Sequence, residues 1–230
     1  MHIHGKKYRK AVEACGEKTF LTSKEALNKV KALSFVNFDE SVDVDVVLGI
    51  DASKGDQVVR GTVSLPHGTG KKTRVAVFAK GDAADQAKAA GADYVGDDDL
   101  IEKISGGWVD FDYAVATPDM MIAVGQLARI LGPRGLLPNK KVGTVTTDVA
   151  NTVKGLKGGT TFFKNDKYGL VHFSFGKVSF GAEKLQENLA AFYKVLQSSK
   201  PTSSKGKFIK KVSISSSMGV SLLVDQDTIA

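Results

Sequence analysis

The residues best suited to chemistry lie in the segment from Lys211 to Gly219, near the end of the printed sequence. Alternate side chains of a β-strand share a face, and one face of this segment would hold Lys211, Ser213, Ser215 and Ser217. Small hydroxyls bounded by a lysine can donate hydrogen bonds to phosphate oxygens and can pair with the 2′-hydroxyls of RNA. The pattern favours a strand that binds a sugar–phosphate backbone. A solvated strand face that binds nothing stays open as the alternative.

Other residues could extend this strand into a larger binding surface. Met218 offers an adaptable apolar contact for a ribose or a base, and Gly219 permits a close approach of a backbone. Phe38 can either stack on a base or pack in the core, and both interpretations stay open. Four further basic or titratable side chains surround a predicted turn at residues 165–169, namely Lys164, Lys167, His172 and Lys177.

No pattern in the sequence predicts an enzyme or a bound cofactor. The segment Gly68–Lys72 is similar to a phosphate-binding Walker loop, but Lys72 stands where Ser or Thr must reach magnesium. No G-x-G-x-x-G follows a predicted strand. Asp97–Asp99 is typical of a helix N-terminus. The sequence has one cysteine and four scattered histidines, His2, His4, His67 and His172, so it lacks the ligand spacing of a zinc site. His2 and His4 are expected in a disordered tip. We therefore expect no catalytic residue, no metal and no cofactor.

The charge of the chain favours a polyanionic partner and indicates where it binds. The 32 basic and 25 acidic side chains among 230 residues leave a net charge of +7. Residues 1–67 and 68–159 each carry a net charge of +1, whereas residues 160–230 carry +5. The asymmetry indicates a binding face built largely from the C-terminal third, but it does not identify the polyanion.

The composition is that of an ordinary globular protein, with 42% hydrophobic and 25% charged residues. No run approaches the roughly 20 apolar residues that span a bilayer. The basic segment at residues 1–10 leads into no apolar region, and the single Cys15 cannot form an intrachain disulfide. We therefore expect a cytoplasmic protein without membrane contact.

Both ends of the sequence show mixed helix and strand patterns. Lys6–Lys10 predicts either a frayed helix or an arm on a partner. Thr22 and Glu25 form a capping box that begins a helix. Residues 42–50 alternate strictly and predict a strand, and a second strand is expected near 58–65. After residue 160 we expect a hairpin of strands 160–164 and 170–175, final strands from 208 to 224, and a helix striped by Leu185, Leu189, Phe192 and Leu196.

The middle of the sequence alternates apolar strands with helices. Strands are expected at 74–79, 94–95 and 113–116, and helices at 82–90, 98–104, 119–131 and 147–156. This alternation predicts a parallel sheet covered on both faces, as in Rossmann-like domains. Two glycine-containing segments, near residues 68 and 159, would act as hinges that link this middle region to the two ends of the chain. The predicted fold class is α/β and α+β in two domains. A discontinuous α+β RNA-binding domain comprises residues 1–67 and 160–230, and an inserted Rossmann-like α/β domain comprises residues 68–159.

Several segments of the sequence resemble the ribosomal protein L-one family in its bacterial type, the large-subunit stalk proteins. The longest are Arg60–Gly68, which reads RGTVSLPHG, and Leu131–Asn139, which reads LGPRGLLPN. Shorter matching segments occur in the same order along nearly the whole chain, at 48–51, 91–93, 165–167 and 217–219. Where the family commonly has threonines, this sequence has Ser215, Ser216 and Ser217, which keep the hydroxyls and lose the methyls.

The resemblance implies a function as well as a fold. It implies that a first domain built from both termini binds a folded stem–loop of large-subunit ribosomal RNA and so forms the mobile stalk near the exit-site tRNA. It also implies that the free protein, a monomer, represses translation of its own messenger RNA by binding the leader. The family's RNA contacts carry over to Phe38 with its neighbours Asp39 and Glu40, to Asp166, Lys167, His172, Gly176, Lys177 and Ser179, and to Ser215, Ser217, Met218 and Gly219. Lys211 and Ser213 join these candidates through the strand pattern.

Two functions of other classes stay open beside RNA binding. An α/β enzyme would bind a phosphorylated small molecule at the strand ends of the middle domain, near Lys80, Thr117 and Asp119. A generic basic module would bind DNA without a preference for RNA.

Overall fold

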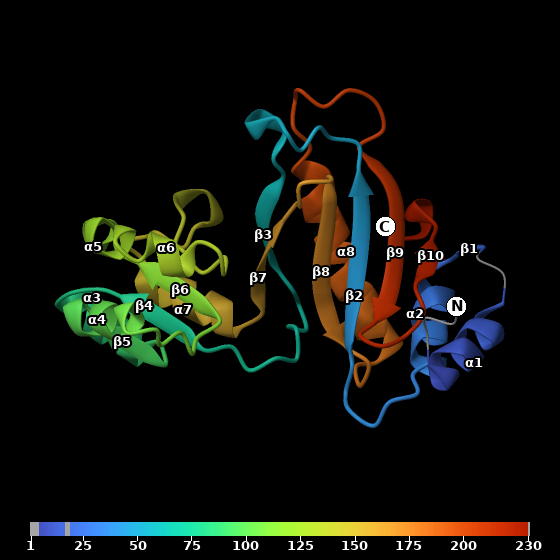
Figure 1. Ribbon diagram of the computed structural model, residues 1–230, viewed down its shortest axis with the longest axis horizontal. Helices are drawn as coiled ribbons and strands as arrows, with labels where there is room; N and C mark the ends of the chain where they lie inside the picture. Colours follow the sequence, from blue (N-terminus) through green and yellow to red (C-terminus); the bar gives the residue numbers. More distant parts are fainter. Residues whose placement is uncertain (1–4, 17–18, 230) are drawn as a thin grey trace. The chain divides into compact units, whose positions relative to one another are not determined.

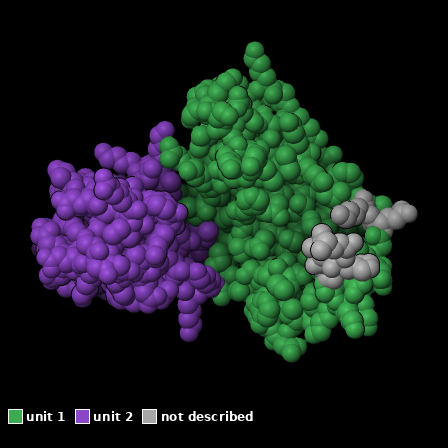
Figure 2. Space-filling view, in the orientation of Figure 1, with its two compact units in different colours: residues 1–70, 162–230 green, residues 71–161 purple. Residues whose placement is uncertain are grey.

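The chain folds into two compact units, one inserted into the other. The computed structural model describes residues 5–16 and 19–229. Unit 1 combines Met1–Gly70 with Phe162–Ala230, and unit 2 consists of Lys71–Thr161 (Figure 2). The domain boundaries expected from the sequence, 67/68 and 159/160, lie close to these divisions.

A five-stranded sheet forms the centre of unit 1, in the order β1-β10-β9-β2-β8 (Figure 1). Its middle strand, β2 (Ser41–Leu48), pairs antiparallel with β8 (Leu170–Lys177) and with β9 (Ile209–Ser216). The outer strands are β10 (Leu222–Val224) and β1 (Phe20–Leu21). Because β2 from the first half of the chain lies between two strands from the last third, both ends are needed to complete the sheet.

Helices cover the apolar face of this sheet. The alternation in β2 leaves Val42, Val44 and Val46 with 0% of their surface exposed, as the sequence predicts. Helix α8 (Ala182–Ser198) packs against β8, and α2 (Ser23–Ala32) packs against β9 and β10; Figure 1 shows both behind the strands. The predicted stripe on α8 is confirmed, because all four of its side chains are buried: Leu185, Leu189, Phe192 and Leu196.

The N-terminal residues confirm two local predictions. The basic segment forms the first turns of α1 (Lys6–Cys15), which buries Ala11 and Cys15, so it is a helix rather than an extended arm. The capping box also forms: the Glu25 amide donates to Thr22 Oγ1 at 3.4 Å, and the Thr22 amide donates to Glu25 Oε2 at 3.1 Å.

The predicted hairpin after residue 160 is wrong. Strand β7 (Thr160–Lys164) pairs with β3 (Arg60–Ser64) in a separate two-stranded sheet, whereas β8 joins the large sheet. Asn165 is the cause, because its amide donates to the Val59 carbonyl at 2.9 Å and its Oδ1 accepts the Val59 amide at 2.8 Å. The chain is thus held against the segment before β3 and reaches β8 through a turn at a single bridge, Asn165 to Val171.

Unit 2 is a parallel sheet with helices on both faces, as the strand–helix alternation predicts. Its strands β4 (Val75–Phe78), β5 (Tyr94–Gly96) and β6 (Tyr113–Ala116) have the order β5-β4-β6. Two pairs of helices pack together, α3 (Asp82–Ala89) with α7 (Val149–Lys157) and α4 (Asp98–Ser105) with α5 (Met121–Gly125).

One predicted helix of unit 2, at 119–131, is broken into three pieces. They are a 3-10 turn η2 (Pro118–Met120), α5, and α6 (Ala128–Leu131). Between α5 and α6 the amides of Gln126 and Leu127 bond three residues back, which tightens the backbone and interrupts the α-helix. The other single turns are η1 (Gly55–Gln57), η3 (Lys140–Val142) and η4 (Gln226–Thr228).

Candidate nucleic-acid interface

Side chains from the end of β8 and from the residue after β9 meet at Ser41, the first residue of β2. Lys177 Nζ donates to Ser41 Oγ at 3.0 Å, and the Ser41 amide donates to Ser217 Oγ at 3.2 Å. A cation at the end of β8 and a hydroxyl after β9 are therefore held on either side of one residue. Lys177 and Ser217 lie on the same side of the molecule, which an RNA-binding strand face requires.

A β-bulge turns Lys177 toward this face. Strict alternation would place Lys177 on the buried side with Phe173 and Phe175. However, the pairing of β8 with β2 shifts between Val42 and Asp43, so that Gly176 opposes Val42 and Ser174 opposes Asp43. The extra residue reverses the alternation, and Lys177 then lies opposite Ser41 on the open face.

Two acidic residues before β2 tie the neighbouring loops together. Glu40 is 1% exposed; its Oε1 accepts the Met218 amide at 2.9 Å, and its Oε2 accepts the Ser34 hydroxyl at 2.6 Å. Asp39 accepts hydrogen bonds from the Ser179 amide at 3.0 Å and from the Ser179 hydroxyl at 2.8 Å. Because Glu40 is buried, it can only position Met218 and cannot itself contact a ligand, which corrects the expectation that Glu40 binds RNA directly.

Two large apolar side chains are exposed on these same loops. Phe38 is 57% exposed and Met218 is 54% exposed. The alternative that Phe38 packs in the core is therefore wrong. We call the surface formed by these side chains and their polar neighbours the Phe38–Met218 edge; it consists of Phe38, Asp39, Lys177, Ser179, Ser217 and Met218.

The middle of the open sheet face is acidic. Asp43 lies between Ser174 and Ser215 in register, and Asp45 lies between His172 and Ser213. Partial burial raises the pKa of Asp43; the Ser174 hydroxyl opposes this rise, and the charge of Asp45 adds to it. His172 Nδ1 lies 2.6 Å from Asp45 Oδ1. The serines predicted to face outward do so, with Val212 and Ile214 buried beneath them.

A second cationic end lies at the opposite end of the strands. Lys211 opposes Val47, six residues along β2 from Ser41, which corresponds to about 20 Å at the rise of a strand. Leu170 opposes Val47 on the other side, and the turn before it carries Lys167. The Lys167 ammonium lies 5.0 Å from the centre of the Tyr168 ring, which is 72% exposed. Lys167 and Lys211 are thus separate from the Phe38–Met218 edge, and the exposed Tyr168 is a candidate that the sequence analysis missed.

Asp166 shapes the turn that presents Lys167. Its Oδ1 accepts the amides of Tyr168 and Leu170, each at 2.8 Å. The Leu170 amide above all, together with that of Tyr168, lowers the pKa of Asp166 below its ordinary value. Asp166 Oδ1 is therefore engaged with the backbone of its own turn, and a contact of Asp166 with RNA stays a prediction.

We expect Asp166→Asn to change how stability depends on pH. Since the folded pKa is lowered, the stabilisation by Asp166 is fully present above the unfolded pKa of about 3.9 and is lost as the pH falls through the folded value. In urea unfolding at pH 7 and pH 5, the wild type should have a higher free energy of unfolding than the variant. At pH 3 the difference between the two free energies should be smaller. The same difference in free energy of unfolding at all three pH values would contradict the lowered pKa of Asp166.

The two candidate glycines lie close to side chains of the protein itself, which would have to shift if a larger residue replaced them. A Cβ on Gly176 would lie 2.5 Å from Leu185 Cδ2, beneath α8. A Cβ on Gly219 would lie 2.3 Å from Ser216 Oγ. Gly219 therefore also has a packing role within the turn, while its close approach to an RNA backbone stays a prediction. A Gly219→Val variant would disturb the Met218 turn itself and would not be a clean test of binding.

Other features of the described chain bear on the remaining predictions. Within residues 5–16 and 19–229, no group of three or more His, Cys, Asp or Glu side chains is placed to hold a metal ion. No helix in the part that the structure describes is long and apolar enough to cross a membrane. The predicted disordered tip with His2 and His4 lies outside the described residues.

Comparisons with known proteins give the chain a clear relationship. The model of the ribosomal protein L1p/L10e family matches residues 29–220. A protein of Nitratidesulfovibrio vulgaris called large ribosomal subunit protein uL1 is 52% identical over 229 residues, which cover 100% of this chain and 97% of the relative. A Thermobifida fusca protein with the same name is 55% identical over 221 residues, covering 96% of this chain and 94% of that protein.

The matched region includes β2, β8 and β9, the strands that carry the Phe38–Met218 edge and the open sheet face. The similarity thus extends across both units. The chain belongs to the ribosomal protein L1p/L10e family.

Proposed function

We propose that the chain is a non-enzymatic protein of the large ribosomal subunit that binds folded large-subunit ribosomal RNA through unit 1. The observation that carries this proposal is the pairing of Lys177 and Ser217 on Ser41 beside the exposed Phe38 and Met218. A cation, hydroxyls and two apolar side chains on one stiff edge can meet phosphate, 2′-hydroxyl and ribose or base at once. The relatives are named large ribosomal subunit proteins, which supports the ribosomal part of this proposal.

The charge pattern of the open face suggests how RNA would lie on it. Lys177 at one end of β2 would bind one phosphate, and Lys211 with Lys167 at the other end would bind another. The two ends are about 20 Å apart along β2. Asp43 and Asp45 between them repel phosphate, but their carboxylates can accept hydrogen bonds from ribose hydroxyls or base amines. This alternation of charge would select a folded RNA contour rather than any polyanion.

Further parts of the proposal follow from the family resemblance. The bound RNA would form the mobile stalk near the exit-site tRNA, and the free monomer would bind the leader of its own messenger RNA and repress translation. The test is filter binding to the matching stem–loop of large-subunit RNA, to the messenger leader and to duplex DNA, each across a salt series. We expect tight binding of both RNAs and weak binding of DNA. Equal affinity for duplex DNA would favour the generic basic module instead.

We expect unit 1 to bind RNA without most of unit 2. Unit 1 has its own buried core, in which Phe173 and Phe192 stack with ring centres 4.3 Å apart. Deleting residues 71–157 and joining Gly70 to Gly158 should change RNA affinity by less than about threefold, because the proposed contacts all lie in unit 1. Filter binding measures this. If residues 71–161 alone bound the RNA and the shortened chain did not, the assignment to unit 1 would be wrong.

A further inference from the structure

Unit 2 contains a hollow at the place where open α/β sheets bind ligands. With the order β5-β4-β6, the chain leaves β4 toward one side of the sheet and returns to β6 on the other. The segments that follow β4 and β6 therefore diverge, and they leave a crevice at the carboxyl ends of these two strands. A hollow of about 330 Å³ lies there, lined by Lys80 after β4 and by Thr117 and Asp119 after β6.

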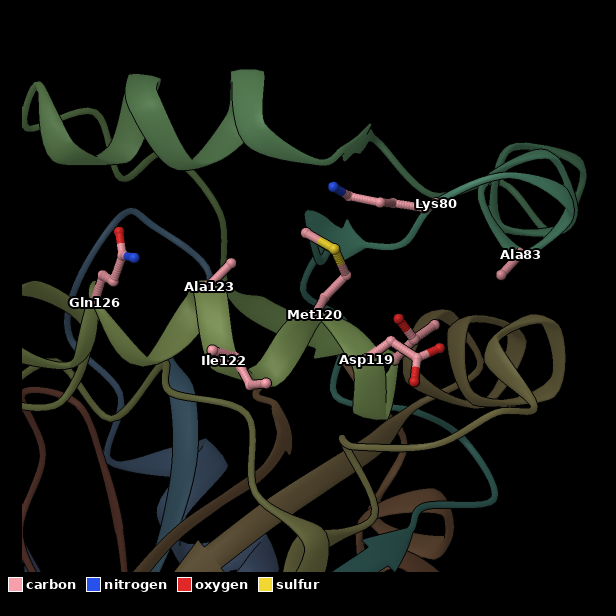
Figure 3. A pocket seen from close by; sticks show the side chains of 8 residues that line it. Lys80, Ala83, Asp119, Met120, Ile122, Ala123 and Gln126 are labelled. Carbon is pink, nitrogen blue, oxygen red and sulfur yellow. The ribbon is translucent and has the colours of Figure 1, made fainter.

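The hollow is lined by four apolar residues and by four polar ones, Lys80, Thr117, Asp119 and Gln126. Met120 and Ala123 line it from η2 and α5, and Ala83 lines it from α3. Figure 3 shows the side chains of Lys80, Met120 and Ala123 turned toward the same space. Ile122 also lines the hollow and is 87% exposed. A large apolar side chain is therefore exposed to solvent at the rim of the hollow.

One hydroxyl that lines the hollow, that of Thr117, has no hydrogen-bond partner among the described residues. Thr117 is 8% exposed and lines the hollow, and in the described chain its side chain forms no hydrogen bond. Its backbone is engaged, since its amide donates to the Phe78 carbonyl at 3.0 Å. A hydroxyl held in place by its backbone and facing a hollow is available to a ligand.

The charges around the hollow disfavour a phosphate and favour a cation. Asp119 is the one carboxylate among the lining residues. The Lys80 ammonium, the one cation among the lining residues, already lies 3.3 Å from Asp98 Oδ2 and 4.0 Å from Asp97 Oδ2. The first turn of α3 carries Asp82 and Asp85, which oppose the approach of an anion to its N-terminus. The expected site for a phosphorylated small molecule near Lys80, Thr117 and Asp119 therefore has the wrong charge.

We propose that this hollow is a docking site for a basic peptide segment of a protein partner, which inserts a Lys or Arg side chain beside an aliphatic residue. The ammonium or guanidinium would reach Asp119, and its donor N–H would meet Thr117 Oγ1. The neighbouring aliphatic side chain would cover Ile122, which a free polyamine would leave exposed. This surface is independent of the RNA-binding proposal, since all of its residues lie in unit 2.

The test uses the full chain and synthetic peptides. The probe is a fluorescein-labelled decapeptide with six lysines and two adjacent leucines; a second probe replaces both leucines with glycine, and spermidine serves as a competitor. Because the whole protein carries a charge of +7, a basic peptide is repelled overall and binds only where the local charge is reversed. Fluorescence anisotropy measures the affinity of each peptide.

We expect the leucine peptide to bind at least about fivefold more tightly than the glycine peptide. Asp119→Asn and Ile122→Ser should each weaken the leucine peptide by at least about fivefold, and Ile122→Ser should leave the glycine peptide unchanged. Glu102→Gln is the matched control, because it removes an exposed charge of unit 2 that does not line the hollow, and it should change affinity by less than about twofold.

Three results would overturn the proposal: no binding of the leucine peptide to the wild type, equal weakening by Glu102→Gln and Asp119→Asn, or full displacement by spermidine at the same charge concentration. A rise in melting temperature with inorganic phosphate or a nucleotide that Asp119→Asn enhances would instead restore the small-molecule site.

Discussion

Met218→Asp should lower the affinity for the ribosomal RNA stem–loop by about 100-fold while the protein stays folded. The Met218 side chain is 54% exposed on the Phe38–Met218 edge. The hydrogen bond to Glu40 comes from the backbone amide of residue 218, so the substitution keeps it. A carboxylate at this position faces the RNA backbone, and like charges brought together at an interface cost several kcal/mol, about 3 kcal/mol being a factor near 100. Filter binding measures the loss, and circular dichroism confirms the fold.

Two control variants separate a local contact from a general effect of charge. Met218→Leu keeps an apolar side chain of similar size and should stay within about threefold of the wild type. Ile122→Asp adds the same charge to another exposed apolar residue, but in unit 2, and should also stay within about threefold. If a folded Met218→Asp protein bound RNA normally, or if Ile122→Asp lost as much affinity, the Phe38–Met218 edge would not be the RNA site.

Asn188→Leu should destabilise unit 1 by about 2 kcal/mol, because a buried polar group left without its partner costs about 1–3 kcal/mol, and partly exposed groups, which can bond to water instead, cost less. Asn188 is 0% exposed on α8. Its Nδ2 donates to the carbonyls of Phe175 at 2.8 Å and Gly68 at 2.9 Å, and its Oδ1 accepts the His67 amide at 3.1 Å. Leucine fills the same space, so the loss would come from these three groups and not from a cavity.

Urea unfolding can follow the two units separately. The single tryptophan, Trp108, packs edge-on against Tyr94 in unit 2, so its fluorescence reports that unit, while circular dichroism reports both. Asn188→Leu should lower the midpoint seen by circular dichroism and leave the Trp108 transition in place. Glu187→Gln, which alters only the exposed neighbour that contacts His67, should cost less than about 1 kcal/mol. Equal losses in the two variants would show that the buried amide network contributes nothing.

The long, strongly periodic segments could be predicted from the sequence because burial alone decides them. The alternation around Val44 and the stripe containing Leu189 each have one arrangement that removes their apolar side chains from water. The capping box at Thr22 is equally local, since it joins residues three apart. The strand–helix alternation of unit 2 likewise limits the sheet to a parallel one.

Pairing between distant segments was not predictable in the same way. Asn165 reads as a turn residue, yet its contacts with Val59 hold β7 against β3 and remove it from the expected hairpin. Glu40 resembled an exposed neighbour of Phe38, but the Met218 amide and the Ser34 hydroxyl satisfy its carboxylate inside the protein. Val59 and Met218 lie more than 100 residues from these partners, too far along the chain for any spacing rule to reveal.

The sequence by itself determined the two kinds of fold, the family resemblance and the outward row of serines on β9, since each follows from residue types at short, regular spacing. Only the tertiary structure decided that Lys177 lies on the open face. Its position in the alternation would bury it, and a bulge that forms only when β8 pairs with β2 reverses its direction. The physical reason is that a strand's register depends on its partner, and a shift of one residue moves every later side chain to the other face.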